Sequence, residues 1–242
     1  MLGNYLRASS VPVISGEPIA YVGGYAQTLI GTTSDVVVTF GGNLTGGVSN
    51  SASEGDLVIV YFGTGSVVEQ AISISGYTQL TKLYVDASLY DTNLLVAYKF
   101  MGSTPDTSIT LLGGTFDTRD AGAVCIQVWR NVNLTTPFDV TTTTDTNSST
   151  VLCDPPSITP VTSGSYIVSG GAGAHSRGIP VFTSSDLSGF ISVGSNDTRD
   201  VAIGLGYKEW VSGSFDPSQF TFGGLDSTSN SNASVTIALR PA

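Results

Sequence analysis

Charged residues are scarce in this chain: Asp, Glu, Lys and Arg make up 12% of its 242 residues, against roughly 25% in an ordinary soluble domain. The cations are scattered, and they are outnumbered by the acidic residues, which gives a formal net charge of −10. Nucleic-acid affinity depends on clustered cations that neutralise phosphates. The composition therefore excludes a nucleic-acid partner and predicts a surface of Ser, Thr, Asn and Gly.

Metal-ligating and nucleophilic residues are equally few. Cys125 and Cys153 do not form a CxxC pair, and with His175 as the one histidine they cannot make a zinc site. We expect two buried free thiols, with a single disulfide as the alternative. His175 lies in a glycine-rich stretch, residues 170–178, which we expect to be a loop. Neither a GxSxG elbow nor a Gly-Lys-Ser/Thr sequence is present there, so we expect no catalytic triad, nucleotide or other cofactor.

Long apolar runs are also absent. The longest, residues 57–62, is far shorter than the ~20 residues that a membrane-spanning helix needs. The N-terminus lacks the apolar run of a signal peptide. We therefore expect a soluble protein with no membrane partner and no Sec-type signal.

What the sequence does contain is short, β-branched apolar segments separated by Gly, Asn, Asp or Pro, a pattern typical of β-strands. Helical periodicity is almost absent, so the pattern predicts an all-β fold. In residues 233–239 apolar and small polar residues alternate, as expected for a strand with one face in a core. The predicted strands are residues 35–40, 56–62, 93–100, 108–112, 121–129, 166–169, 201–210, 219–222 and 233–239.

An internal repeat is the most informative feature of the sequence. Four segments recur in the same order, each 109 or 110 residues later. The matches are residues 55–60 with 164–169, Tyr98-Lys99 with Tyr207-Lys208, residues 104–114 with 214–224, and Arg130 with Arg240. Because the matches are collinear, they indicate a tandem duplication.

The duplication predicts the domain organisation. Residues 33–140 and 141–242 are two related units, each with too few strands for a well-covered core of its own. We expect them to supply the two sheets of one jelly-roll-like or Greek-key β-sandwich, with two small tandem sandwiches as the alternative. Residues 141–150 would form the polar loop that joins the units.

Residues 1–32 lie outside the repeat and, with their proline and glycine content, predict an extended N-terminal arm that lies against another molecule. Its large side chains are the candidate docking residues. These are Tyr5, Leu6, Arg7, Tyr21 and Tyr25.

Acidic residues give little sign of catalysis. Glu209 adjoins Trp210 at a predicted strand end, where a raised pKa would suit a glycosidase acid, but no second carboxylate clusters with it. We interpret it as a solvated charge. The recurring Asp-Thr-Arg-Asp sequences at residues 117–120 and 197–200 lack the alternating oxygen ligands of a calcium loop, so we interpret them as turns with a local Asp–Arg pair.

Aromatic residues near strand ends either close a core or stack on a sugar. We favour packing for most of them. The candidates for contact with a glycan or a protein partner are Trp210, Tyr90 and Tyr77.

Lysine, the residue that most often protects exposed sheet edges, occurs only at positions 82, 99 and 208. The edges of this many-stranded protein must therefore be closed by the fold, covered by the arm or paired with another chain. We infer an oligomer or a partner in a larger assembly, and a trimer is one candidate.

Several segments resemble the pattern of β-rich structural proteins of tailed bacteriophages. They are residues 55–60, 98–102, 128–133, 136–140 and 237–242, and the resemblance covers roughly residues 50–242. It implies a non-enzymatic virion protein, a head decoration, fibre or tail component, which is assembled in the host cytoplasm and exposed on the particle. Its partners would be other copies of itself and other virion proteins. The alternatives are a glycan- or receptor-binding fibre module and, less favoured, a polysaccharide depolymerase.

Overall fold

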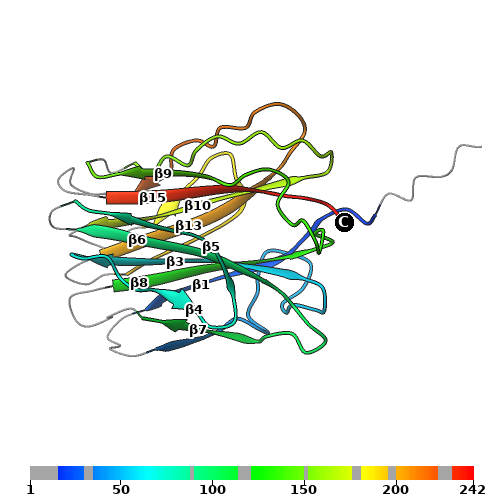
Figure 1. Ribbon diagram of the computed structural model, residues 1–242, viewed down its shortest axis with the longest axis horizontal. Coiled ribbons are helices and arrows are strands. Elements are labelled where there is room, and N and C mark those ends of the chain that lie inside the picture. The colour runs from blue at the N-terminus through cyan, green and yellow to red at the C-terminus, as the bar shows by residue number, and fades with distance from the viewer. Residues whose placement is uncertain are drawn as a thin grey trace, which may run out of the picture.

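The computed structural model describes residues 16–29, 35–87, 90–113, 121–149, 152–175, 181–195, 200–222 and 231–242. Within these ranges every regular element is a β-strand (Figure 1). The prediction of an all-β sandwich is therefore confirmed.

The first half of the chain forms one large antiparallel sheet with the strand order β1-β8-β3-β6-β5. Its strands are β1 (Ala20–Leu29), β3 (Leu57–Ser66), β5 (Thr78–Val85), β6 (Asp91–Phe100) and β8 (Ala121–Arg130). The second half forms another, with the order β12-β13-β10-β15-β9. Its strands are β9 (Thr143–Asn147), β10 (Tyr166–His175), β12 (Ser188–Ser195), β13 (Asp200–Glu209) and β15 (Ser231–Leu239).

Two small sheets cover the outer faces of the large ones. In the first half β2 (Val36–Thr39), β7 (Ser108–Leu112) and β4 (Ser73–Ile74) pair in the order β2-β7-β4. Figure 1 shows β4 and β7 on the side of the first large sheet that faces away from β10, β13 and β15. In the second half β11 (Phe182–Thr183) pairs with β14 (Thr221–Phe222). Along the first half the strands β1 to β5 alternate between the large and the small sheet, β6 then pairs with β5 in the large sheet, and β7 and β8 return to the small and the large sheet.

The two large sheets pack face to face around the main core. In β3, Leu57, Ile59 and Tyr61 belong to this central core, whereas Val58 and Val60 belong to the core under the small sheet. Burial on both faces explains why this strand is an unbroken apolar run. The Tyr61 hydroxyl crosses between the sheets and donates to the Val235 carbonyl at 3.1 Å.

The strand orders of the two halves correspond. Reversed, the second order becomes β9-β15-β10-β13-β12, and its members match β1-β8-β3-β6-β5 one by one. The correspondence places β3 with β10, β6 with β13 and β8 with β15, the strands that the sequence repeat aligns. A tandem duplication would produce this arrangement. The strand orders also match β1 with β9, the first strand of each large sheet.

The place of β1 corrects the expected extent of the N-terminal arm. Residues 20–29 pair with β8 along the whole strand, so this part of residues 1–32 belongs to the first sheet. Tyr21 packs between the sheets, with its ring centroid 5.2 Å from that of Trp129 and 4.8 Å from that of Tyr207. Tyr5, Leu6 and Arg7 lie outside the described residues.

Two segments expected to be loops are strands. The polar run at 141–150 contains β9, which pairs with β15. The glycine-rich stretch from residue 170 continues β10 up to His175. Its glycines allow close packing: a Cβ on Gly170 would lie 2.9 Å from the Tyr61 ring, and one on Gly171 would lie 2.3 Å from the Cys153 sulfur.

Gly63 provides a test of the contact between the large sheets. A Cβ there would lie 2.8 Å from the Ala172 Cβ, so Gly63→Ala should force the sheets apart and lower the free energy of unfolding by about 1–3 kcal/mol. Gly102→Ala is the matched control, because a Cβ at Gly102 meets nothing within 4 Å. Urea denaturation of both variants measures the effect. Equal stability of the two variants would contradict the close approach of the sheets at Gly63.

Candidate functional site

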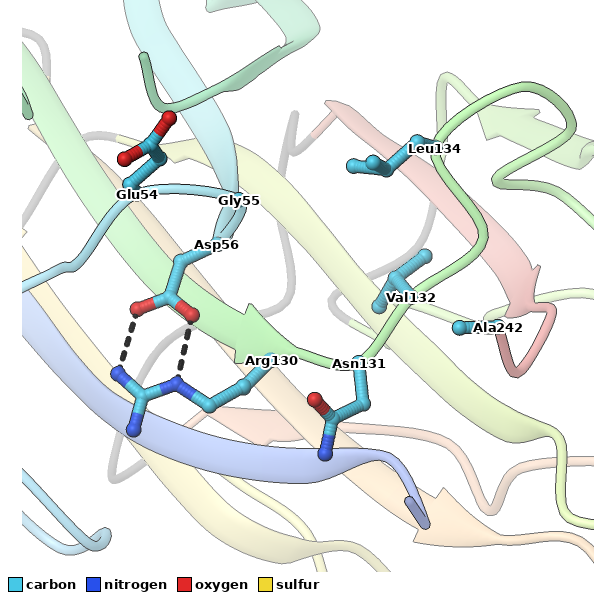
Figure 2. Close-up of a pocket in the computed structure, with 8 residues that line it drawn as sticks. All are labelled: Glu54, Gly55, Asp56, Arg130, Asn131, Val132, Leu134 and Ala242. Carbon is cyan, nitrogen blue, oxygen red and sulfur yellow. Dashed lines mark hydrogen bonds and ion pairs between the residues drawn. The ribbon is translucent and has the colours of Figure 1, made fainter. Parts of the chain in front are cut away.

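The first candidate site is a pocket of about 290 Å³ at the end of the molecule where the C-terminus lies (Figures 1 and 2). Its charged centre is a bidentate ion pair: Arg130 Nε and an Arg130 terminal nitrogen each lie 2.8 Å from an Asp56 carboxylate oxygen. The Ser53 amide also donates to Asp56, at 2.8 Å. The hydrogen bond to Asp56 raises the pKa of Arg130. This pair ties the start of β3 to the end of β8.

A second ion pair occupies the corresponding strand end of the other half. Arg240, the repeat partner of Arg130, lies 3.3 Å from the buried Asp139 carboxylate. Burial alone would raise the pKa of Asp139, but the Thr162 hydroxyl, the Val161 and Thr162 amides and Arg240 together lower it. The Asp139 carboxylate is therefore held as an anion. The carboxylate oxygens of both Asp56 and Asp139 accept several hydrogen bonds, which gives the two side chains a structural role.

Trp210 lines a separate pocket of about 130 Å³ after the end of β13. Its indole N–H donates to the Gly213 carbonyl at 2.8 Å, which fixes the ring on its own turn. Lys208, Glu209, Val211 and Ser212 also line the pocket, and Val211 is 87% exposed. The site combines a partly exposed aromatic ring with hydrogen-bond donors and hydrogen-bond acceptors.

The other two aromatic candidates do not join Trp210. Tyr90 directly precedes β6, at the edge of the sandwich where Ser66 pairs with Asp91. Trp210 follows β13 at the opposite end of the strands, a distance of roughly 30 Å for a ten-residue strand. Tyr77 is packed against the core under the small sheet. Burial, together with the nearby Asp106 carboxylate, raises the pKa of its hydroxyl.

Tyr25, the remaining arm residue, is half-buried on β1 and donates to the Gln27 side chain at 2.9 Å. It lines a groove of about 440 Å³ between β1 and β12. A second groove, of about 380 Å³, lies between β5 and β9, the corresponding strands on the other side. Sequence reasoning missed this second groove, because its β9 wall was expected to be a loop.

The two cysteines are free and buried, as the first of our two expectations had it. Burial raises the pKa of both thiols, so neither is a ready nucleophile. The Asp-Thr-Arg-Asp turn at 117–120, and residues 197–199 of its repeat, lie outside the described residues. In the part of the chain that the structure describes, no three His, Cys, Asp or Glu side chains form a group that would hold a metal ion. The same residues contain no helix of the length and apolarity that a membrane crossing requires.

Comparison with known proteins returned no match: no family model, no curated protein and no solved structure is similar to this chain.

Asp139 gives a pH-dependent test of the ion pairs. Its pKa is lowered in the folded protein, so its stabilisation is complete above the unfolded pKa of about 3.9 and is lost as the pH falls through the folded value. Asp139→Asn should lower the free energy of unfolding at pH 7 by about 3 kcal/mol, because the side chain loses the charge opposite Arg240 and one of its two acceptor oxygens. The variant should also lose less stability than the wild type between pH 6 and pH 3, as measured by urea denaturation at each pH.

The control for this test is Asp216→Asn, since Asp216 is exposed. We expect it to change stability by less than about 0.5 kcal/mol. An Asp139 variant that kept the wild-type pH dependence would show that its carboxylate does not stabilise the fold.

Proposed function

We propose that this chain is a non-enzymatic structural protein of a tailed bacteriophage particle, which docks on the particle and associates with further copies of itself. The observation that carries the proposal is the use of its charges: the two buried carboxylates with arginine partners, Asp56 and Asp139, tie strand ends together. A scaffold held in this way suits a load-bearing subunit. The resemblance of residues 50–242 to phage structural proteins supports the same conclusion.

Residues 1–15 are a candidate docking segment because of where the described chain begins. A Cβ on Gly16, the first described residue, would lie 2.7 Å from the carbonyl oxygen of Ala242. Both ends of the described chain therefore meet beside the Asp56–Arg130 pocket. Fifteen residues precede Gly16, enough to reach about 50 Å when extended.

Particle incorporation tests this function. Purified particles should contain the chain in many copies, detectable by mass spectrometry and by antibody labelling in electron micrographs. Deletion of residues 1–15 should abolish incorporation while the circular dichroism of the purified variant stays that of the wild type, because β1 is retained. A deletion reaching residue 31 is unsuitable, since it removes β1. Absence of the chain from purified particles would refute the proposal, and normal incorporation of the deletion variant would refute the docking role of the segment.

A second function, glycan binding, is favoured by the Trp210 pocket. Sugars bind on aromatic faces flanked by hydrogen-bonding side chains, and Trp210 has Lys208, Glu209 and Ser212 around it. Glu209 is the one carboxylate that lines this pocket, whereas a glycosidase needs two, about 5–10 Å apart. The pocket thus supports binding rather than depolymerisation.

A glycan array separates the two functions. If the chain binds glycans here, Trp210→Ala should reduce the signal at least about fivefold, since loss of an aromatic stacking contact costs about 1 kcal/mol or more. Val48→Ala is the control, because Val48 is exposed, lacks an aromatic face and is not among the residues that line this pocket. Binding that survives Trp210→Ala would place any glycan site elsewhere.

A further inference from the structure

The large sheets have four edge strands, and three of them carry a feature that blocks pairing with another chain. On β1, Gly24 and Thr45 exchange two backbone hydrogen bonds of 2.9 Å, so residues 43–50 cover this edge. β5 has a bulge between Gln79 and Thr81 and carries Lys82. β12 also has a register shift, and the Phe182 amide donates to its Ser192 side chain at 2.8 Å.

The fourth edge, β9, lacks these protections. Its sequence, Thr-Thr-Asp-Thr-Asn, contains no lysine or proline, and its pairing with β15 is regular along its length. Thr144, Asp145 and Thr146 are exposed. Sequence reasoning found the lysine shortage but not the strand that it leaves open.

The direction of the open backbone groups on β9 follows from β15. The Ala238 carbonyl accepts from the Asp139 amide at 2.8 Å, so the even-numbered residues of β15 face the β9 side. The backbone N–H and C=O groups of their partners on β9 therefore point toward β15. These partners are Thr143, Asp145 and Asn147. Thr144 and Thr146 point their N–H and C=O groups outward, and no backbone hydrogen bond reaches these groups from any described residue.

We infer that this edge pairs with the β9 edge of a second copy, antiparallel and about a two-fold axis, so that two large sheets join into one. Backbone pairing of this kind requires outward-facing residues to lie opposite one another. Of the two-fold registers that satisfy this rule, the one centred on Asp145 sets two carboxylates side by side, which is destabilising. The register centred on Thr144 avoids this, because Thr143 then lies opposite the partner's Asp145.

Side chains favour the Thr144 register on both faces of the new pair. Thr142 and Thr144 line the groove between β5 and β9, so their side chains lie on the same face of the strand. On that face Thr144 would lie opposite Thr144 of the second copy, and Thr146 would lie opposite Thr142 of the second copy. Threonine pairs across strands are favourable. On the other face Thr143 would lie opposite the partner's Asp145, so that no second carboxylate faces this charge.

This inference rests on the self-association in the proposed function and names the surface that carries it. Disulfide trapping tests it in the full-length protein. In the Thr144 register the two Thr144 Cα atoms lie about 5.5 Å apart, within the 4.4–6.8 Å range that a disulfide spans. Thr144→Cys should therefore form a covalent dimer under mild oxidation, seen on non-reducing gels. Wild-type protein should form none, because Cys125 and Cys153 are buried.

The matched control is Thr146→Cys, whose two copies would be separated by about 13 Å along the strand in this register. We expect at least about tenfold less covalent dimer from it than from Thr144→Cys. Equal or faster trapping of Thr146→Cys, or no trapping of either variant, would overturn the inference.

A second pair of variants distinguishes failure of the β9 interface from failure of the proposed function. Thr144→Pro removes one outward N–H but no bond to β15, so it should weaken self-association in sedimentation equilibrium at least about tenfold, while Thr144→Val should not. If Thr144→Pro associates as the wild type does, the β9 edge is not the interface, even where the chain is found in particles. If the edge is the interface but the chain is absent from particles, the proposed function fails alone.

Discussion

The close contact between the two large sheets is the constraint on which the rest of the molecule depends. Each sheet is apolar on its inner face, so neither half could expose that face to water without losing its largest buried area. The contact requires residues without side chains where β3 crosses β10. Gly63 faces Ala172, and Gly170 leaves room for the Tyr61 ring. Tyr61 then reaches the Val235 carbonyl in the opposite sheet. The two halves therefore share one central core, although each has its own small outer sheet.

The halves also interlock through their first segments, in a nearly symmetric way. Tyr21 on β1 packs on Tyr207 of the second half, and Phe138, before β9, packs edge-on against Tyr98 of the first half with centroids 4.9 Å apart. Tyr98 and Tyr207 are the tyrosines that the sequence repeat aligns. Thus β1 and the segment that leads into β9 each place an aromatic residue on one of the two tyrosines that the repeat aligns. These contacts give Tyr98 and Tyr207 corresponding positions in the core.

The fold class could be predicted because alternation and β-branching report directly on strands, whereas the first strand of each half could not. β1 is buried and covered by residues 43–50, and β9 is an exposed edge. Different surroundings select different residues, so the two strands share no visible motif although their places in the sheets correspond. The glycines of β10 were mistaken for a loop for a related reason: they meet a ring and a sulfur from other strands, and no local pattern reveals such contacts.

Candidate site residues were harder to predict than strands, because the same residue type serves both packing and binding. Trp129 and Trp210 both stand near strand ends. Trp129 is buried, with its ring 5.0 Å from that of Tyr207 and 5.4 Å from that of Tyr166, while Trp210 lies on a turn of its own and lines a pocket. The difference is made by residues distant in the sequence, so composition and spacing alone could not separate the two.

The scarcity of charge has a structural explanation in how the few charges are used. Asp56 and Asp139 are held inside, where each accepts several hydrogen bonds, and their arginines are partly buried with them. Charged side chains that form ion pairs at strand ends cannot also protect the sheet edges, so the edges depend mainly on covering loops and bulges. Those devices require a neighbouring segment or an irregular strand, and among the described residues β9 has neither. A regular edge strand without lysine or proline leaves backbone groups open to unspecific pairing unless another strand covers it. The same scarcity of charge therefore leaves one edge strand, β9, on which no described residue bonds the outward N–H and C=O groups of Thr144 and Thr146.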